Sequence, residues 1–344
     1  MNILVTGGTG FIGSHTAVEL LLKGFNVFVM DNLNNSRIEV VDAIEKITGK
    51  KISFHQLDCC DYNALNSFFS ENKIDAIIHF AALKAVGESV ADPLKYYRNN
   101  LISLINLLDA CVKFEIKNFV FSSSCTVYGE PDYLPIDEKA PVKKAESPYG
   151  NTKKIAEDIL TDTAKATGIK IISLRYFNPV GAHPSALIGE YPLGKPANLM
   201  PVITQTAIGK LKKLSVYGTD YPTRDGSNIR DYIHVVDLGQ AHVIAVERLF
   251  GGKSKSGFEV FNLGTGTGIS VLEMINAFEN YTGVKLNYEL APRRPGDVVQ
   301  VWADTSYANQ ELGWKAKLDL KAMVTDAWRW EQQLASMEQS LAKK

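Results

Sequence analysis

The sequence has few residues that could fix its shape through covalent cross-links or a metal ion. Its 344 residues include only four cysteines, Cys59, Cys60, Cys111 and Cys125, and no Cys-x-x-Cys pair. Neither a disulfide framework nor a zinc site of that kind is therefore predicted. The six histidines show no metal-ligand spacing either. We expect no metal, and we expect a reducing compartment.

Long apolar runs and an excess of one charge are also lacking. Every apolar run is broken well short of the ~20 residues that a membrane span needs. No Lys or Arg precedes Lys23, and Met1 leads directly into the strand-like run 2–6, so we expect a cytoplasmic protein without a signal peptide. The 37 Lys and Arg nearly balance the 38 Asp and Glu. This balance favours a small-molecule partner over nucleic acid or a membrane.

Two common enzyme motifs are missing. Gly8 and Gly13 have the spacing of a nucleotide-triphosphate loop, but Ser14 and His15 stand where Lys and Ser or Thr are required. No Gly-x-Ser-x-Gly elbow is present, which argues against a hydrolase of that class.

The first half of the chain alternates short apolar runs with longer helical patterns. This rhythm is typical of a parallel β-sheet wound by crossover helices. Strands are expected at Ile3–Thr6, Asn26–Met30, Ile52–Leu57, Ala76–Phe80, Phe119–Ser122 and Ile171–Arg175.

After about residue 177 the rhythm changes, because prolines and glycines become frequent. We expect one later strand at Phe258–Leu263 and helices at Ile269–Tyr281 and Thr305–Leu312. The predicted fold is α/β: a Rossmann-type doubly wound parallel sheet over residues 1–177, with a return segment near 232–262. A smaller α+β substrate-binding lobe is expected over residues 178–344.

A glycine-rich loop follows the first predicted strand. Gly7, Gly10 and Gly13 recur at steps of three, which permits a tight turn and close approach of a pyrophosphate to the start of a helix. Asp31 ends the second strand, where a carboxylate binds a ribose and repels a 2′-phosphate. NAD is therefore favoured over NADP and over a turn that binds nothing. Arg37, which could bind a 2′-phosphate, is interpreted as a solvated loop residue.

Tyr149 and Lys153 are four residues apart and share one face of a predicted helix. A nearby ammonium stabilises a phenolate, so the tyrosine could act as a base. The same spacing occurs at Tyr191 and Tyr281, but proline or glycine interrupts both. Only the first pair follows a good helix start, with Ser147 as the expected N-cap. A surface pair is the alternative.

The fifth predicted strand runs into three serines, 122–124. They fall at the carboxyl edge of the sheet, where open parallel sheets bind ligands. Ser124 is the candidate to share a proton with Tyr149 and a substrate. Ser122 and Ser123 are expected only to end the strand.

These residues resemble the extended short-chain dehydrogenase/reductases, and within them the UDP-glucose 4-epimerases. The resemblance covers nearly the whole chain. It runs through residues 7–13, 80–84, 122–129 and 149–153. The more specific segments follow later, at residues 175–182, 198–201, 230–235, 262–266 and 293–297.

The resemblance implies reversible inversion at C4 of UDP-glucose or UDP-galactose through a 4-keto sugar, with NAD accepting and returning a hydride. It implies that Tyr149 takes the proton of the 4-hydroxyl and that Ser124 bridges the sugar and Tyr149. Lys153 would lower the pKa of Tyr149 and hold the nicotinamide ribose.

The resemblance also implies two further sets of ligand-binding residues. For the cofactor they are Gly7, Gly10, Phe11, Ile12, Gly13, Asp31, Asn32, Asn35, Ser36, Asp58, Phe80, Ala81, Ala82, Lys84, Asn99, Tyr149, Lys153 and Phe177. For the UDP-sugar they are Lys84, Ser124, Tyr149, Asn178, Asn198, Leu199, Ser215, Tyr217, Arg230, Arg294, Asp297 and Val301.

Three positions bear on rival activities. Related dehydratases carry an Asp-Glu pair where this chain has Thr126 and Val127, which argues against dehydration. At Val301 the resembled family often carries either a bulky tyrosine or a small residue, and valine is small, so UDP-N-acetylhexosamines are expected to be accepted as well. A UDP-glucuronate 4-epimerase, a nucleotide-sugar reductase or an NAD-binding sensor without catalysis remain the alternatives.

One predicted helix has an apolar stripe with two interpretations. The stripe consists of Leu94, Tyr97, Leu101, Leu104, Leu108 and Cys111. It could pack on the parent sheet, or it could form a four-helix dimer interface with the Tyr149 helix, as the resemblance implies. A homodimer is expected on the second interpretation.

Overall fold

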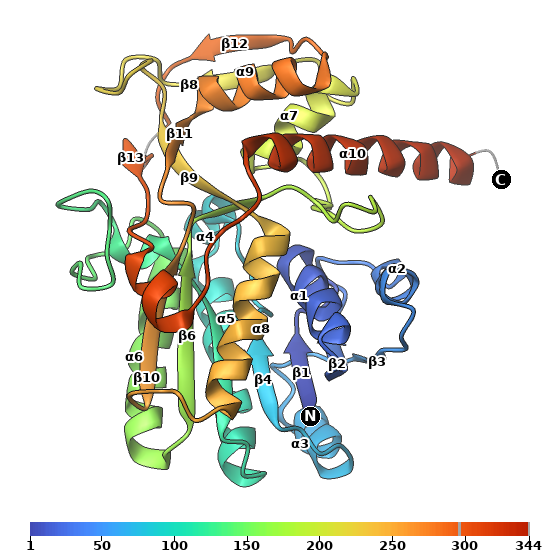
Figure 1. Ribbon diagram of the computed structural model, residues 1–344, viewed down its shortest axis with the longest axis vertical. Helices are drawn as coiled ribbons and strands as arrows, with labels where there is room; N and C mark the ends of the chain where they lie inside the picture. Colours follow the sequence, from blue (N-terminus) through green and yellow to red (C-terminus); the bar gives the residue numbers. More distant parts are fainter. Residues whose placement is uncertain (295–296, 343–344) are drawn as a thin grey trace.

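The computed structural model describes residues 1–294 and 297–342 and shows two lobes (Figure 1). A large lobe is built on a parallel sheet, and a smaller lobe lies beyond the carboxyl ends of its strands. No helix in the described part of the chain is long and apolar enough to cross a membrane.

The large lobe contains a seven-stranded sheet in which all neighbouring strands are parallel. Its spatial order is β10-β6-β5-β4-β1-β2-β3, so the strand order reverses between β4 and β1. The strands are β1 (Asn2–Thr6), β2 (Asn26–Asp31), β3 (Ser53–Gln56), β4 (Ala76–His79), β5 (Asn118–Ser124), β6 (Lys170–Tyr176) and β10 (Phe258–Leu263). Each matches a strand predicted from the sequence, and the predicted fold class is confirmed.

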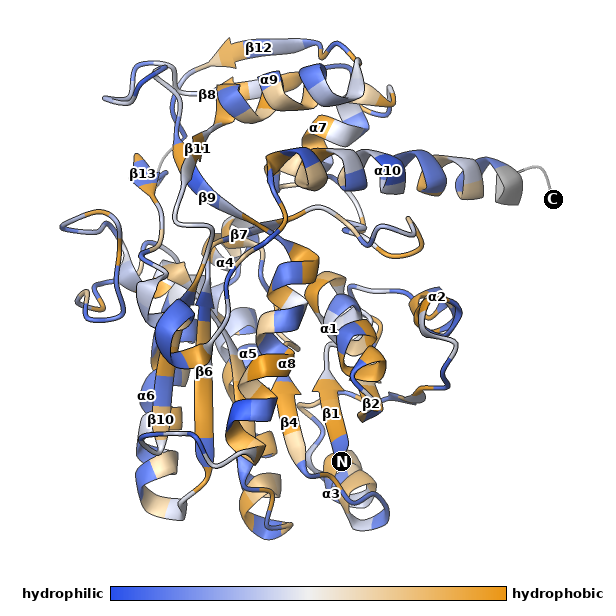
Figure 2. Ribbon diagram, viewed as in Figure 1, coloured by the Kyte–Doolittle hydropathy of each residue, from blue (hydrophilic) through white to orange (hydrophobic). Residues whose placement is uncertain are grey.

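Helices cover both faces of this sheet, because alternate residues of each strand point to opposite sides. Ile3 and Val5 of β1 pack on one side with α1 (Phe11–Leu22), α2 (Glu39–Thr48) and α8 (Val235–Phe250). Leu4, between them, packs on the other side with α3 (Tyr62–Glu71), α5 (Pro93–Lys113) and α6 (Pro148–Thr167). Figure 2 shows the strands as predominantly hydrophobic and the helices as two-sided. Both faces are therefore buried.

The smaller lobe has its own core. A small sheet holds β7 (Asn178–Val180), β9 (Ile229–His234), β11 (Gly268–Ser270) and β13 (Gln300–Val301), while β8 (Leu214–Tyr217) pairs with β12 (Tyr288–Ala291). Three helices pack around them: α7 (Leu199–Ala207), α9 (Val271–Thr282) and α10 (Leu320–Ala342). The remaining elements are α4 (Val86–Ala91) and the short turns η1 (Cys125–Tyr128) and η2 (Ala308–Leu312).

The chain returns to the large lobe twice. After β9 it forms α8, which packs on α1, and then β10, which completes the large sheet. Later, Ala308, Leu312 and Trp314 enter the core of the same lobe. The sequence indicated the first return but gave no sign of the second.

Two predicted helices differ from those observed. The helix expected from Ile269 begins at Val271, because Ile269 pairs with Arg230 between β11 and β9. The short helix expected at Thr305–Leu312 is a π-helical turn over Ala308–Leu312.

The apolar stripe of α5 packs mainly on the parent sheet. Leu104, Leu108 and Cys111 are buried in the sheet's core, whereas Leu94 is 64% exposed. A second row of apolar side chains on α5 faces outward instead, formed by Ile102, Ile105 and Val112.

Candidate active site

The glycine loop between β1 and α1 has the shape of a nucleotide cradle. Gly7 has φ of +68°, and a Cβ there would lie 2.7 Å from the backbone nitrogen of Ala81. A Cβ at Gly13 would lie 2.2 Å from the carbonyl oxygen of Gly7. Gly10 is the N-cap of α1 and offers no side chain to the first amides of the helix. The loop therefore suits a phosphate group at the helix N-terminus.

Asp31 organises the loop that follows β2. Its carboxylate accepts hydrogen bonds from the amides of Leu33 (2.9 Å) and Thr9 (3.2 Å) and from the hydroxyl of Ser36 (2.9 Å). The Thr9 hydroxyl in turn donates to Ser36 at 2.8 Å. A buried carboxylate next to the glycine loop fits the predicted ribose contact.

Arg37 is exposed to solvent, as expected, but it also contacts the smaller lobe. Its guanidinium lies 4.1 Å from the ring centroid of Tyr191, which belongs to the smaller lobe. The sequence could not show this contact, because the two residues are far apart in the chain.

The other predicted cofactor residues lie around the same edge of the sheet. Asn32 donates to Asp58 (3.0 Å) in the loops after β2 and β3, and Asn99 donates to Asn100 (2.9 Å) at the start of α5. The remaining ones are Phe11 and Ile12 at the start of α1, Asn35 in the β2 loop, Phe80, Ala81, Ala82 and Lys84 after β4, and Phe177 after β6.

The three predicted catalytic residues come together where β5 meets α6. Ser124 ends β5, and Tyr149 lies in the first turn of α6 behind the Ser147 N-cap, whose hydroxyl accepts from the amide of Gly150 (3.2 Å). The Ser124 side chain lies close enough to Tyr149 to lower the pKa of the tyrosine. Lys153, one turn further along α6, is buried and donates to the carbonyl oxygen of Ser122 at 2.6 Å. Its Nζ lies 6.0 Å from the Tyr149 ring centroid.

Burial sets the proton affinities of this pair. It raises the pKa of Tyr149 to about 12, while the Ser124 side chain acts in the opposite direction. It lowers the pKa of Lys153 to about 8, and the charge of Glu157 opposes this. The resemblance implied that Lys153 lowers the pKa of Tyr149, but in the structure burial outweighs the neighbouring groups and the net shift is upward.

Sequence reasoning missed a buried ion pair beneath the catalytic residues. Glu157, one turn beyond Lys153 on α6, binds Arg175 of β6 through both carboxylate oxygens. It also accepts from Ser123 at 2.6 Å and from Ser173 at 2.8 Å. Ser123 therefore has a partner on α6 and does more than end the strand. The signal available was a Glu four residues after Lys153 on the same helix face.

Tyr176 was also missed. Its ring is buried at the end of β6, and its hydroxyl hydrogen-bonds that of Ser122, whose carbonyl holds Lys153. The sequence signal was its place at a strand end, next to the predicted Phe177.

A first group of predicted substrate residues of the smaller lobe lies on β9 and β13. Val301 of β13 pairs in register with Arg230 of β9, and Val301 is 7% exposed. Asp231, which sequence reasoning missed, accepts hydrogen bonds from the amides of Thr265, Gly266 and Ala303. It thereby fixes β13 against β9.

The Gly264–Gly268 segment is a close-packed turn. A Cβ at Gly264 would lie 2.3 Å from the Asp231 carboxylate, so the turn encloses that side chain. The turn leads into β11 and not directly into a helix.

A second group of predicted substrate residues surrounds the end of β8. The Arg294 guanidinium lies 4.8 Å from the Tyr217 ring centroid and binds Asp297 through two hydrogen bonds of 2.9 and 3.2 Å. Ser215 donates to Glu289 on the neighbouring strand β12 at 3.2 Å. Pro295 and Gly296 of the same motif lie outside the described residues.

Asn178, Asn198 and Leu199 lie between these groups and the large lobe. Asn178 begins β7, and Asn198 is the N-cap of α7, whose first residue is Leu199. The Asn198 amide donates to Glu190 at 2.6 Å, and Lys84 donates to the same carboxylate oxygen at 3.3 Å. Lys84, predicted for both ligands, and Asn198, predicted for the UDP-sugar, thus bind the same carboxylate.

Comparison with known proteins agrees with this geometry. Residues 4–327 match a family model described as GDP-mannose 4,6 dehydratase. The UDP-glucose 4-epimerase of Bacillus subtilis (strain 168) is 53% identical over 332 residues, which cover 96% of this chain and 97% of that protein.

Two crystal structures of UDP-glucose 4-epimerases have nearly the same fold. The Bifidobacterium longum enzyme, in complex with NAD+ and UDP, has a TM-score of 0.93 and 48% identity over 97% of this chain and 98% of its own. The Stenotrophomonas maltophila enzyme, with bound NAD and formylated UDP-arabinopyranose, has a TM-score of 0.94 and 49% identity over 98% of this chain and 99% of its own. The chain belongs to the UDP-glucose 4-epimerase family.

Membership of the epimerase family accounts for the match to a dehydratase model. Thr126 and Val127 occupy the turn η1 directly after Ser124, and neither can supply a carboxylic acid for elimination. Epimerases and dehydratases of nucleotide sugars both need the glycine loop and a Tyr-Lys pair, whereas only dehydration needs the added acids.

Proposed function

We propose that this protein interconverts UDP-glucose and UDP-galactose by inversion at C4, with NAD as its resident cofactor. The observation that carries the proposal is the placement of Ser124, Tyr149 and Lys153 at the sheet edge that carries the glycine loop. No neighbouring dehydratase acid accompanies them.

The residues of the chain divide the chemistry between them. Tyr149 takes the proton of the sugar 4-hydroxyl, and Ser124 hydrogen-bonds Tyr149 and the same oxygen. NAD, held by the glycine loop and Asp31, would supply reversible hydride transfer at C4 of the sugar. Lys153 supplies a positive charge that favours the phenolate once Tyr149 is deprotonated. Arg230 and Arg294 bind the diphosphate as cationic donors, so that the sugar remains free to turn.

The cradle fits the cofactor. The glycine loop leaves the first amides of α1 to a pyrophosphate, and Asp31 faces the position of an adenosine ribose. Gly7, Gly13 and Asp31 would hold the nucleotide, while Tyr149 and Lys153 would face the nicotinamide end.

The test is conversion of UDP-galactose to UDP-glucose by purified protein without added reductant. Tyr149→Phe should reduce the rate by at least about a thousandfold while NAD content is unchanged, because only the proton acceptor is removed. Near wild-type conversion by Tyr149→Phe would contradict the assigned base. Conversion of UDP-glucuronate alone would indicate the rival epimerase, and binding of NAD without any conversion would indicate a sensor.

We further propose acceptance of N-acetylated sugars, a homodimer and a cytoplasmic location. The small Val301 beside Arg230 supports the first, because it leaves room next to the sugar-binding strand. The outward-facing Ile102, Ile105 and Val112 of α5 support the second. The four free cysteines fit the third.

A further inference from the structure

Residues 183–197 of the smaller lobe form a strap along the large lobe, and two consecutive residues of this strap, Glu190 and Tyr191, contact cationic side chains there. Glu190 accepts a hydrogen bond from Lys84 at 3.3 Å, and its side chain is only 11% exposed. The ring centroid of Tyr191 lies 4.1 Å from the Arg37 guanidinium. Each of the two residues therefore contacts a cationic side chain of the other lobe.

The two contacts lie on opposite sides of the glycine loop. Lys84 follows β4, and Arg37 follows Ser36 in the loop after β2. In the sheet, β1 lies between β4 and β2, and the glycine loop 7–13 follows β1. The strap therefore spans the edge of the sheet at which the pyrophosphate and adenosine ribose are proposed to bind.

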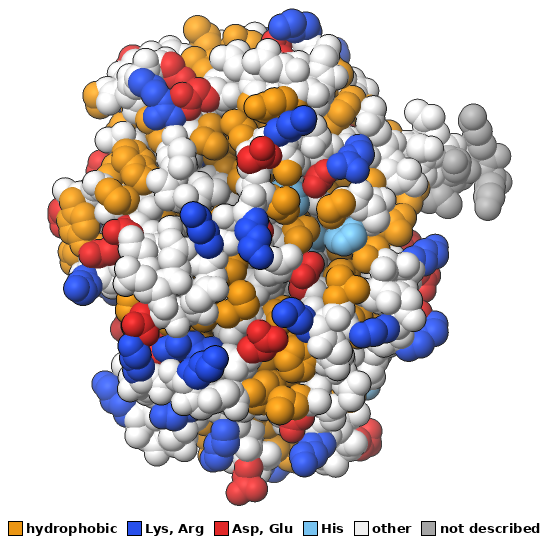
Figure 3. Space-filling model, viewed as in Figure 1, with side chains coloured by type: hydrophobic (Ala, Val, Ile, Leu, Met, Phe, Trp, Pro, Cys, Tyr) orange, Lys and Arg blue, Asp and Glu red, His pale blue; other side chains and the backbone are white. Residues whose placement is uncertain are grey.

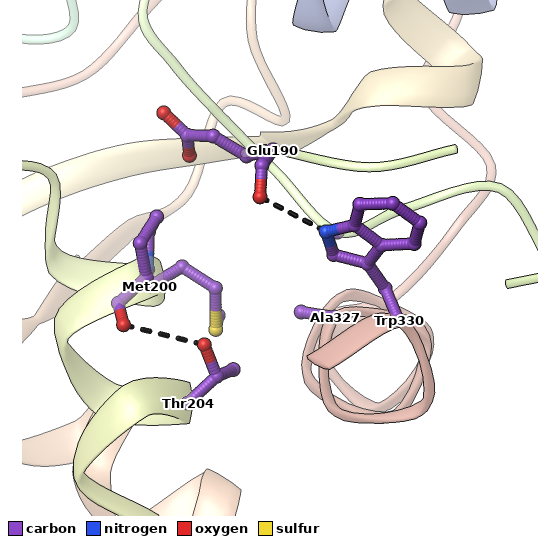
Figure 4. Close-up of a pocket in the computed structure, with 7 residues that line it drawn as sticks. Glu190, Met200, Thr204, Ala327 and Trp330 are labelled. Carbon is purple, nitrogen blue, oxygen red and sulfur yellow. Dashed lines mark hydrogen bonds between the residues drawn. The ribbon is translucent and has the colours of Figure 1, made fainter. Parts of the chain in front are cut away.

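The strap is fixed from behind by the C-terminal helix α10. The indole nitrogen of Trp330 donates to the carbonyl oxygen of Glu190 at 2.9 Å (Figure 4). Gly189 packs directly on this ring, since a Cβ there would lie 2.4 Å from Trp330 Cγ. The Tyr191 hydroxyl donates to Glu338 at 3.1 Å, and Glu338 also pairs with Lys210 at 2.9 Å.

These contacts give the Tyr191 ring a defined orientation. The ring packs edge-on against Trp330, with centroids 6.5 Å apart, while its other contacts are the Arg37 guanidinium and the Glu338 carboxylate. The hydrogen bond from Lys210 is the largest cause of the lowered pKa of Glu338. The hydrogen bond from Tyr191 and the positive charge of Arg37 lower this pKa further. The ring is thus held where the guanidinium can stack on it.

We propose that Tyr191 and Glu190 are positioning residues that slow the release of NAD by holding Arg37 and Lys84 across the cofactor groove. The proposal rests on the proposed function, in which the hydride accepted from the sugar must be returned to the same molecule. Loss of the cofactor between the two transfers would leave a keto sugar that the enzyme cannot reduce.

The test measures NAD release from the purified holoenzyme. Enzyme loaded with radiolabelled NAD is diluted into excess unlabelled NAD, and the label retained on the protein is followed with time. Tyr191→Leu should release NAD about fivefold faster, which corresponds to the loss of one partly buried cation–π contact. Tyr191→Phe keeps the ring and should release NAD at close to the wild-type rate.

A double-mutant cycle separates this role from a general loss of structure. Arg37→Met should accelerate release to a similar extent, and the Arg37→Met/Tyr191→Leu variant should release NAD no faster than the faster single variant. Tyr281→Leu, at an exposed tyrosine of α9, is the matched control and should match the wild type. Glu190→Gln should also accelerate release, because it weakens the contact with Lys84.

Three outcomes would overturn the proposal or the function beneath it. Wild-type release by Tyr191→Leu would overturn the proposal, as would additive effects in the double variant, since the two residues would then act independently. A wild-type protein that retains no NAD at all would overturn the proposed function itself.

Discussion

Tyr149 and Lys153 show how burial and charge compete at a single pair of residues. Burial disfavours both charged forms, so the pKa of Tyr149 is raised to about 12 and that of Lys153 is lowered to about 8. Catalysis needs the tyrosine to lose a proton readily. A positive charge close to the ring would favour this loss. The Lys153 ammonium donates its hydrogen bond to the Ser122 carbonyl oxygen instead.

The lowered pKa of Lys153 predicts how stability depends on pH. Between pH 8 and 10.5 the unfolded chain binds a proton at this lysine that the folded protein has released, so the free energy of unfolding should rise with pH. The rise should be on the order of 3 kcal/mol, since one pKa unit corresponds to about 1.4 kcal/mol. Urea unfolding of the wild type and Lys153→Met at pH 8 and pH 10 gives this difference. A stability difference between the two proteins that does not change with pH would refute it.

Val301 predicts the range of sugars. Tyrosine at this buried position next to Arg230 would fill space beside the sugar-binding strand, so Val301→Tyr should lower kcat/KM for UDP-N-acetylgalactosamine at least about tenfold relative to UDP-galactose. Val301→Ala serves as control and should keep both activities. The idea fails if the wild type converts UDP-galactose but not UDP-N-acetylgalactosamine.

At the scale of elements, α6 joins the sheet through a buried ion pair as well as through its apolar side chains. Tyr149, Lys153 and Glu157 follow at steps of four and share a face of the helix. Glu157 lies over Ser123 and Arg175, which are direct partners across β5 and β6. Sliding the helix by one residue would shift it by about 1.5 Å and turn this face by roughly 100°. The pair therefore sets where the catalytic residues stand relative to Ser124.

Glu157→Gln should destabilise the protein by about 3–5 kcal/mol, because it leaves Arg175 buried without its carboxylate. Chemical unfolding measures the loss, and activity per folded molecule should also fall about tenfold or more. The matched control is Glu259→Gln, which breaks the buried pair with Arg248 between β10 and α8, away from the catalytic residues. Its folded fraction should retain full kcat. Equal activity losses in both variants would show that Glu157 contributes stability alone.

At the scale of the molecule, the lobes meet over the carboxyl ends of the strands. Charges of both signs are interspersed on the face shown in Figure 3, which fits the net charge of −1. Among the exposed apolar side chains is the outward row of α5, with Ile102 41% and Ile105 43% exposed. Burying that row in a second copy would explain why it is apolar.

Ile102→Glu together with Ile105→Glu should convert a dimer into a monomer, because two like charges would be buried at the centre of a symmetric interface. Light scattering coupled to size-exclusion chromatography gives the mass directly. Leu290→Glu, at a position 61% exposed on β12, is the control and should leave the mass unchanged. A wild-type protein with the mass of one chain would refute the dimer.

The sequence by itself determined the features that depend on neighbours in the chain. Short apolar runs, most of them alternating with helical patterns, predicted the seven strands of the large sheet. The spacing of Gly7, Gly10 and Gly13 predicted the nucleotide cradle. Ser147 predicted where the Tyr149 helix begins. Each of these follows from local backbone geometry and hydrogen bonding, which a short stretch of sequence encodes.

Only the tertiary structure decided which distant side chains meet. Arg37 stacks on Tyr191, and Tyr128 donates to Asn262 at 2.7 Å, a residue 134 positions away. Trp314 enters the core of the large lobe after the chain has already formed the smaller one. Such contacts depend on how complete elements pack, and no periodicity along the chain records them. Burial, which sets the proton affinities of Tyr149 and Lys153, is decided at the same level.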